Sequence, residues 1–317
     1  MSAPNRETAM RSATLPVIGL KLDQIRDADI YVEMSGKRVL YRGSDYPMDE
    51  SAITDLLSHG HSVVHVVKST PVEAAPEEAV AQVLQDANVP AAEKSKVLYT
   101  MSSAILEDAI KHPRADFAKR VSDMVRTSMD HLLHGSEVFN CFKEIAGKNP
   151  SLYSHSVSTA FFSMAMANFL KGFSQDDIAE LGVGCMFHDV GKNRIPRSVA
   201  DRPRRSPEAQ ALYEQHVLLG KDWVEQLGAL SEIAKRIVLE HHERVDGKGF
   251  PNKLKGADIH PLAKIAAIAD SYDSLTAESP YRPAKSPFEA LKVMTMEMRG
   301  AFDPLMLKDF ILVVSQS

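Results

Sequence analysis

Five segments in the second half of the chain carry histidine or aspartate on helical faces that are otherwise apolar. In the stretch SHSVSTAFFSMAMANFL, residue His155 shares one stripe with Thr159, Phe162, Met166 and Phe169. A buried imidazole needs a hydrogen-bond partner, and an isolated buried carboxylate is costly to remove from water. A chain with this pattern must therefore fold so that these polar groups meet a common partner inside the core.

The pattern recurs at intervals that suit consecutive helices. Four further stretches carry it: DDIAELGVGCMFHDV contains His188-Asp189, PEAQALYEQHVLLGKDWVEQL contains His216, SEIAKRIVLEHHE contains His241-His242, and PLAKIAAIADSYDSLTAE contains Asp270. The intervals are 33, 28, 25 and 28 residues (155 to 188, 188 to 216, 216 to 241 and 242 to 270). Each interval accommodates a helix, a short loop and the next helix, so antiparallel neighbours could bring the groups to one level.

A pair of divalent metal ions would give these five histidines and two aspartates one shared partner. Nitrogen and carboxylate oxygen ligands without sulfur suit iron, manganese, nickel or zinc. Seven protein groups are too many for one metal with an open position, and they suit two metals bridged by a carboxylate. Each group has a simpler interpretation when taken alone: a core histidine is often structural, and an HD pair or a helix-ending HHE is a weak signal.

The rest of the pattern predicts a mostly α protein with a small N-terminal α/β domain. Alternating apolar residues around Ser35-Gly36 indicate a hairpin, MDESAITDLLSHG indicates a helix capped by Asp49 or Ser51 and stopped by Gly60, and HSVVHVVKS indicates a buried strand. We expect a disordered tail over 1–14, a regulatory α/β domain over 15–68, a linker with some helix over 69–90, connecting helices over 91–150, and a helical bundle over 151–317.

Composition narrows the class of protein. The net charge of −5 indicates no general affinity for duplex nucleic acid. The two cysteines, Cys141 and Cys185, form no CxxC pair, which favours a reducing cytoplasm and argues against a thiolate metal site. No stretch approaches the ~20 apolar residues of a membrane helix. We therefore expect a cytoplasmic protein without a membrane segment.

Several ordered motifs resemble the HD-GYP subgroup of the HD phosphohydrolase superfamily. They are HDVGK, His216 with Gly220 four residues later, HHERVDGKGFP and IADSYDSLTAESPYRP, and they span roughly residues 150–315. The resemblance implies an HD-type helical bundle, a centre of two or three metals (iron first, manganese next) and cleavage of cyclic di-GMP or a related dinucleotide. The module at 15–68 is more loosely similar to the domain often found before HD-GYP domains.

The resemblance also implies roles for individual residues. By motif position, one metal would be held by His155, His188, Asp189 and Asp270, and the other by Asp189, His216, His241 and His242, with Asp189 bridging. Asp189 and Lys192 would be catalytic, with Lys192 contacting a substrate phosphate. Further substrate contacts would come from the signature loop, Asp246, Gly247, Gly249, Phe250 and Pro251, and from Arg282 near the substrate entrance.

Two positions depart from the family pattern. Phe250 stands where the signature loop usually has tyrosine, and Ser151 stands where members with three metals carry glutamate, so we expect two metals. The predicted reaction is hydrolysis of cyclic di-GMP to a linear dinucleotide or GMP by a hydroxide bridging the metals, with Lys192 neutralising charge on the phosphate. The alternatives are a weakly active or inactive protein that binds a nucleotide, and a phosphohydrolase for another nucleotide. We also expect protein partners that bind through the signature loop or the N-terminal domain, and we expect a homodimer.

Overall fold

The computed structural model divides the chain into two compact units, Met1–Ala104 and Ile105–Ser317. It describes residues 11–315 except 24, 35–36, 47, 69–75, 135, 149–150, 201, 203–204 and 280. Each unit has its own core. The predicted fold class, mostly α with a small N-terminal α/β domain, is confirmed.

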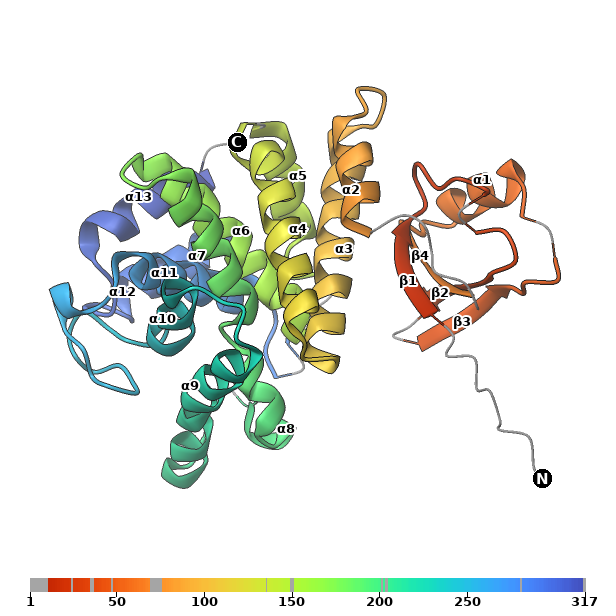
Figure 1. Cartoon of the computed structure of the whole chain (residues 1–317). Helices are drawn as coiled ribbons and strands as arrows, with labels where there is room; N and C mark the ends of the chain where they lie inside the picture. Colours follow the sequence, from red (N-terminus) through yellow and green to blue (C-terminus); the bar gives the residue numbers. More distant parts are fainter. Residues whose placement is uncertain are drawn as a thin grey trace, which may run out of the picture. The chain divides into compact units, whose positions relative to one another are not determined.

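The first unit contains a four-stranded antiparallel sheet with one helix on its face (Figure 1). The strands are β1 (Arg11–Pro16), β2 (Asp29–Met34), β3 (Lys37–Arg42) and β4 (Val63–Lys68), in the order β1-β4-β2-β3, and helix α1 (Glu50–Ser58) joins β3 to β4. The register pairs Leu15 with Val64. Leu56 of α1 is buried together with Leu15, Ile30 and Val64 in this core. The sheet thus covers its apolar face with α1.

The local predictions for this unit can be compared with the structure. The strands of the predicted hairpin are β2 and β3, whereas its turn at 35–36 lies outside the described residues. Asp49 caps α1 by accepting the Ala52 N–H at 3.0 Å, and Gly60 follows the helix with a φ of +81°. A helix, α1, and a buried strand, β4, therefore occupy the positions that the pattern predicted.

One segment is more ordered than the sequence predicted, and the linker contains the helix that the sequence predicted. Residues 11–14 were assigned to a disordered tail, which is wrong, because β1 starts at Arg11 and pairs with β4 along its whole length. Residues 1–10 lie outside the described residues. The predicted linker contains helix α2 (Pro76–Gln85), which packs against β1 and buries Val80, Val83 and Leu84. The spacing of these three residues places them on one helical face.

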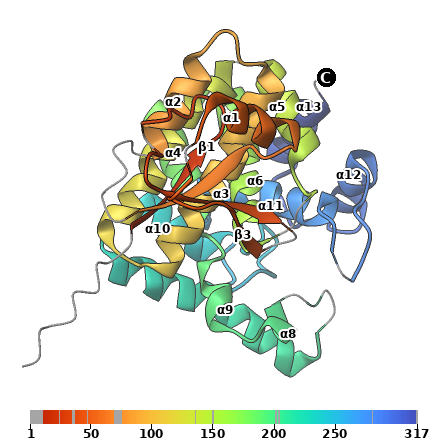
Figure 2. The same ribbon diagram turned by 90° about the vertical axis from the view of Figure 1, so that its right-hand side faces the viewer.

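The second unit is a bundle of helices around α6 and α7 (Figures 1 and 2). Helix α3 (Ala91–Lys111) leads from the first unit into this one. The elements that follow are α4 (Ala115–His134), α5 (Ser136–Ile145), α6 (Leu152–Leu170), α7 (Gln175–Phe187), the 3-10 helix η1 (Val190–Arg194), α8 (Arg197–Ala200), α9 (Pro207–Leu227), α10 (Glu232–Glu240), η2 (Gly256–Asp258), α11 (Pro261–Thr276), α12 (Pro287–Met296) and α13 (Pro304–Ser315).

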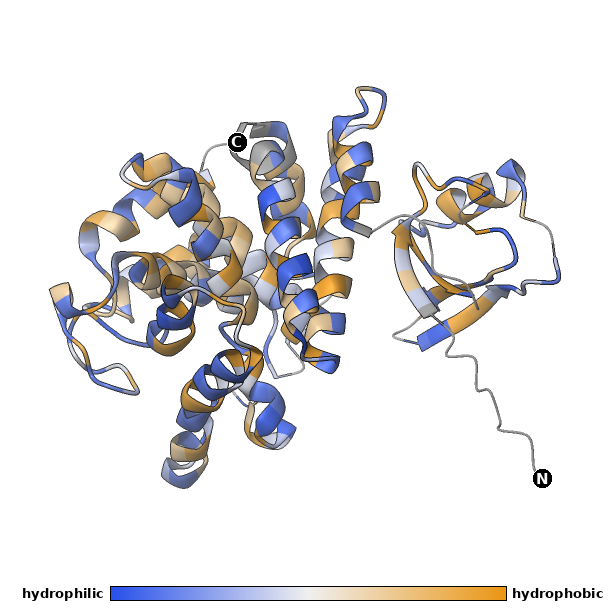
Figure 3. Cartoon of the chain, viewed as in Figure 1, coloured by the Kyte–Doolittle hydropathy of each residue, from blue (hydrophilic) through white to orange (hydrophobic). Residues whose placement is uncertain are grey.

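The central helices are apolar over most of their surface. Helix α6 packs against α7, α11 and α13, and α7 packs against α6 and α10. Figure 3 shows the predominantly hydrophobic colouring of α6 and α7. Helix α4, which the sequence predicts as one of the connecting helices, packs against both of them. Among the described residues, no helix has the length and apolar character needed to cross a bilayer.

Helix ends in the bundle are fixed by caps and by one close backbone approach. Ser151 and Ser154 form a capping box that starts α6, and Ser174 caps α7. Between η1 and α9 there is no room for a side chain, because a Cβ on Gly191 would lie 1.9 Å from the His216 carbonyl oxygen and 2.6 Å from the Gly220 nitrogen. The glycines of the HDVGK and H216 motifs therefore let η1 and α9 meet directly.

Candidate metal centre

The structure brings the seven predicted ligands together inside the bundle. They form two groups, one of Asp189, His216, His241 and His242 and one of His155, His188 and Asp270, and within each group the potential ligand atoms lie within 4.8 Å of one another. The side chains come from α6, α9 and α11 and from residues that directly follow α7 and α10. Five of the seven residues are buried, and His155 and His242 are partly buried.

Asp189 lies between the two groups with one carboxylate oxygen toward each. Its Oδ1 is 3.4 Å from Nε2 of His216 and 3.7 Å from Nε2 of His241. Its Oδ2 is 3.5 Å from Nε2 of His155 and 3.4 Å from Nε2 of His188. A carboxylate placed in this way has the geometry of a bridge between two cations.

Asp270 occupies a second position that faces both groups. Its Oδ1 is 3.0 Å from Nε2 of His155 and 3.8 Å from Nε2 of His188. Its Oδ2 is 3.9 Å from Nδ1 of His242. The carboxylate therefore lies closest to His155, in the three-residue group.

Backbone carbonyls orient three of the histidines. The Nδ1 atoms of His188, His216 and His241 lie 2.6, 2.6 and 2.9 Å from the carbonyl oxygens of Cys185, Tyr213 and Val238. A carbonyl can only accept, so each Nδ1 carries the proton and each Nε2 lone pair faces inward. The carbonyl in each case belongs to the residue three positions earlier, which is how a helical turn fixes the ring.

His155 is oriented by a carboxylate instead. Its Nδ1 donates to Oδ2 of Asp273 at 2.7 Å. Burial opposes protonation of the ring, but the neighbouring carboxylates of Asp270 and Asp273 outweigh it and raise the pKa of His155 to about 10. Asp273 was not predicted as a site residue. It lies three positions after Asp270 on α11, so the same helical-face argument could have identified it.

The inward-facing atoms test whether the centre suits a cation. Among the described residues, the buried atoms without a hydrogen-bond partner include Nε2 of His155, His188, His216 and His241 and Oδ1 of Asp189. Buried polar atoms are almost always satisfied, so five such atoms directed at one region require an explanation. Imidazole nitrogen and carboxylate oxygen are ligands that a divalent transition metal accepts, and at His155 a metal ion would replace the proton that the two neighbouring carboxylates favour.

The protonation states also suit metal binding. Burial lowers the pKa of His241 to about 4. Burial, together with the neighbouring His241 and His216, holds the pKa of His242 well below its usual value. Both rings are therefore neutral at pH 7 and keep a lone pair for a metal ion.

Lys192 lies at the edge of the centre. Its Nζ donates to Oδ2 of Asp189, and its side chain is 20% exposed. Helix α7 ends at Phe187, and Lys192 lies on the 3-10 helix η1 that follows. Residues three positions apart lie on the same side of a 3-10 helix, so this turn brings the Lys192 side chain next to Asp189. Burial disfavours the ammonium, but Asp189 outweighs burial and raises the pKa of Lys192.

The signature loop meets the centre through Phe250. The Phe250 N–H donates to the His242 carbonyl at 3.2 Å, and the ring centroids of the two residues are 4.7 Å apart. The peptide bond from Phe250 to Pro251 is cis. A Cβ on Gly249 would lie 2.5 Å from the backbone of residues 242–244, so the loop is pressed directly onto the segment that carries His242.

Polar groups of this loop are engaged with one another. Both oxygens of Asp246 accept from Arg244, at 3.0 and 2.7 Å, and its Oδ1 accepts the Lys248 N–H at 3.0 Å. Gly247 adopts a φ of +75°. The buried Glu243, which the sequence reading did not select, accepts two further N–H groups of the segment, from Asn252 and Leu254.

Arg282 has a structural contact in this arrangement. Its Nη1 donates to the Leu275 carbonyl at 3.0 Å and thereby ties the loop after α11 to the end of that helix. Its predicted contact with substrate stays a prediction.

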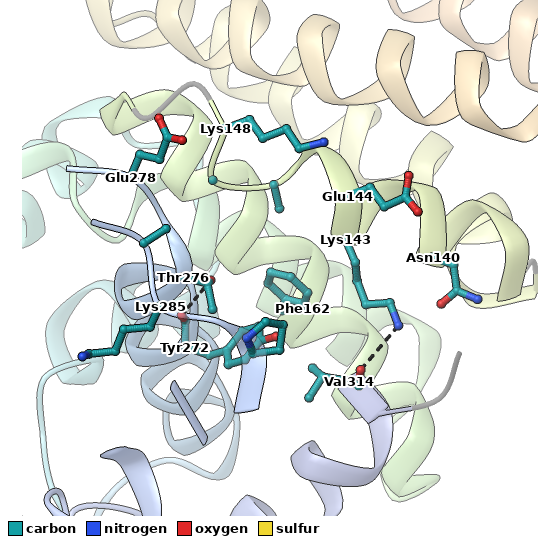
Figure 4. A pocket seen from close by; sticks show the side chains of 14 residues that line it. Asn140, Lys143, Glu144, Lys148, Phe162, Tyr272, Thr276, Glu278, Lys285 and Val314 are labelled. Atoms are coloured by element: carbon teal, nitrogen blue, oxygen red, sulfur yellow. Dashed lines mark hydrogen bonds between the residues drawn. The ribbon is translucent and has the colours of Figure 1, made fainter. Parts of the chain in front are cut away.

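A cavity of about 620 Å³ lies elsewhere in the same unit (Figure 4). Lys143, Lys148, Phe162, Tyr272 and Lys285 are among its lining residues, and Lys143 Nζ donates to the Val314 carbonyl at 3.4 Å. None of the seven clustered histidines and aspartates lines it. We place the candidate functional site at the cluster of histidines and aspartates and not in this cavity, because the cluster supplies the groups that could bind metal ions.

Comparison with known proteins gives a family match to the region that contains the seven clustered residues. Residues 141–306 match the family model of the HD domain. The chain is 30% identical over 163 residues to a cyclic di-GMP phosphodiesterase of Pseudomonas aeruginosa, which covers 51% of this chain and 39% of that protein. It is 27% identical over 212 residues to 3'3'-cGAMP-specific phosphodiesterase 3 of Vibrio cholerae, which covers 63% of this chain and 46% of that protein. The chain thus spans less than half the length of these relatives.

A solved structure has the same fold over nearly the whole chain. An HDG"Y"P protein from Bdellovibrio bacteriovorus superimposes with a TM-score of 0.72 and 18% sequence identity, covering 96% of this chain and 99% of the other. At this level of identity the likeness concerns the fold.

Proposed function

The chain belongs to the HD domain family, and on that premise we propose that it is a metal-dependent phosphodiesterase that cleaves a cyclic dinucleotide. The predicted kinship with the HD-GYP subgroup is confirmed. The observation that carries the proposal is the position of Asp189, whose two carboxylate oxygens each face a different pair of histidine nitrogens.

Two metal positions follow from the two groups. One metal would be held by His155, His188, Asp189 and Asp270, and the other by Asp189, His216, His241 and His242. The nitrogen and oxygen ligands suit iron, manganese, nickel or zinc, and the resemblance to the HD-GYP subgroup favours iron first and manganese next. When bound, such ions polarise a phosphoryl oxygen and lower the pKa of a water molecule.

The protein's own groups prepare the site for a phosphodiester. Asp189 and Asp270 supply negative charge to hold cations, and Lys192 supplies a fixed positive charge beside Asp189. A cation in this place would stabilise charge that grows on the non-bridging oxygens of the phosphate. The burial of His188, His216 and His241 keeps bulk water from these charges, which strengthens their interactions.

The substrate class is supported by the names of the relatives. The relatives above are named as phosphodiesterases for cyclic di-GMP and for 3'3'-cGAMP. Both substrates are cyclic purine dinucleotides, so we propose this class for the chain, with a linear dinucleotide or GMP as product. Contacts to the substrate would come from Lys192, the signature loop and Arg282.

We propose no duplex nucleic acid as a partner, because the chain is acidic overall. Protein partners through the signature loop or the first unit, and a homodimer, remain part of the proposal. So does a cytoplasmic location, which the free thiols of Cys141 and Cys185 favour.

The direct test is turnover by metal-loaded protein. Protein loaded anaerobically with Fe²⁺ or with Mn²⁺ should convert cyclic di-GMP, 3'3'-cGAMP or both to linear dinucleotide, as followed by chromatography. Asp189→Ala should abolish turnover, whereas Asp222→Ala, an exposed change on α9, should leave it intact. The proposal fails if the metal-loaded protein leaves both substrates intact while cleaving another phosphodiester, or if it cleaves neither.

A further inference from the structure

Tyr213 touches two histidines of the same metal group. Its carbonyl accepts from Nδ1 of His216 at 2.6 Å, and its hydroxyl lies 3.4 Å from Nε2 of His242. Its ring centroid is 4.7 Å from that of His216 and 6.0 Å from that of His242. The sequence reading did not select this residue, because a tyrosine one turn before His216 looks like part of an amphipathic helix.

His242 is turned the opposite way from the other four histidines. Its Nδ1 faces Oδ2 of Asp270, at 3.9 Å, and its Nε2 faces the Tyr213 hydroxyl. In His155, His188, His216 and His241 the Nε2 atom faces inward, and Nδ1 meets a carboxylate or carbonyl oxygen.

We propose that His242 binds its metal through Nδ1 and that the Tyr213 hydroxyl accepts the Nε2–H, an inference that rests on the metal centre of the proposed function. Tyr213 is then a positioning residue: its hydroxyl orients His242, just as backbone carbonyls orient His188, His216 and His241. Such outer partners fix the tautomer and the ring orientation of a ligand histidine.

The place of Tyr213 is itself fixed by cations on its ring. The Arg205 guanidinium lies 3.6 Å from the ring centroid, and Lys192 Nζ lies 5.5 Å from it. Arg205 is held in turn, because its Nε donates to the Val199 carbonyl at 2.8 Å and its Nη2 to the Ala200 carbonyl at 2.7 Å. Arg205 thereby links the end of α8 to the ring of Tyr213 beside the metal centre.

The signature loop explains why the hydroxyl must come from α9. The loop presents Phe250 to His242, and a phenyl ring has no group that can accept an N–H in the ring plane. The Phe250 and Tyr213 centroids are 6.3 Å apart, so the two aromatic rings flank His242 together. Phe250 packs against the imidazole of His242, and Tyr213 supplies the hydroxyl oxygen that faces its Nε2.

The test uses zinc alone as a diamagnetic probe and observes the imidazole nitrogens. In zinc-loaded protein labelled with ¹⁵N-histidine, long-range ¹H–¹⁵N spectra should show four ligand rings protonated at Nδ1 and one, assigned by a His242→Gln variant, protonated at Nε2. Tyr213→Phe should shift that Nε2–H signal, accelerate its exchange with water, and weaken one of the two zinc sites by about 10–100-fold in chelator competition. Tyr281→Phe, a change in an exposed loop residue, should alter none of these.

Two results would overturn the inference. One is that all five rings bind zinc through Nε2, and the other is that Tyr213→Phe leaves both the spectrum and the zinc affinity unchanged. Zinc uptake with the predicted tautomer but no hydrolysis with iron or manganese would overturn the proposed function alone. A wild-type chain that binds no zinc would overturn both.

Discussion

The metal centre and the signature loop are neighbours in the structure, yet their polar groups behave in opposite ways. At the centre, Asp189 and four histidines direct buried atoms inward without hydrogen-bond partners. In the loop, Asp246 and Glu243 have their oxygens bonded to Arg244 and to backbone N–H groups. Polar groups that satisfy one another hold a shape, whereas a convergent set that stays unsatisfied is prepared for a ligand.

The largest effect is expected from removing the group shared by both metals. Asp189→Ala takes away both oxygens that would bridge the two metals, so both metals should bind at least about 100-fold more weakly, and turnover should disappear. Metal analysis after gel filtration measures the loss. Unchanged metal content in Asp189→Ala would show that Asp189 is no bridge and would break the contrast between centre and loop.

A smaller loss of metal affinity, confined to one of the two metals, is expected from Asp273→Asn. The amide keeps the shape but removes the charge that orients Nδ1 of His155, so affinity should fall about 10–100-fold at the metal of the His155 group only. Titration with a chelator should then show one weakened and one unchanged site. Asp309→Asn, on α13, serves as the matched control, and equal weakening of both sites would contradict the assignment.

In the loop, Gly249→Ala should affect stability before metal binding. The added Cβ would lie 2.5 Å from fixed backbone, and overpacking of this kind costs about 1–3 kcal/mol in the free energy of unfolding. Urea denaturation measures it, with Gly228→Ala as the comparison because a Cβ there meets nothing within 4 Å, although its φ of +69° carries strain of its own. A Gly249→Ala protein as stable as wild type would show that the loop is not pressed onto residues 242–244.

The smallest effect is expected from Asp246→Asn. The pair with Arg244 is partly exposed, so its loss should cost about 0.2–1 kcal/mol. The hydrogen bond from Arg244 lowers the pKa of Asp246 from 3.8 to about 2, so its contribution is complete above pH 3.8 and is lost as the pH falls toward 2. The difference in stability between wild type and Asp246→Asn should therefore shrink over this range, and a difference that grew would contradict the pairing.

Most of the centre could be predicted from the sequence because each ligand interrupts an apolar period. His155, His188 and Asp270 stand where their helices require hydrophobic residues, so their presence needed an explanation. Tyr213 gave no such signal, since a tyrosine fits an amphipathic face. Asp273 shares a helical face with Asp270, but it lies in a stretch already rich in polar residues, so the distance to His155 is what identifies it as an outer partner.

Other features depended on contacts that a linear pattern does not contain. Strand β1 is ordered because it pairs with β4, about fifty residues away, and the local sequence of 11–14 does not indicate this pairing. Lys192 reaches Asp189 through the 3-10 turn η1, which follows the end of α7 at Phe187. Whether a loop carboxylate faces a ligand or a neighbour such as Arg244 is decided by backbone geometry, so the role of Asp246 could not be read from the motif.

The most direct measurement of the central claim is anomalous diffraction from crystals of the metal-loaded protein. Two peaks should appear, one on each side of the Asp189 carboxylate, with His155 and His188 at the first and His216 and His241 at the second. A single peak, or ions bound away from Asp189, would contradict the account.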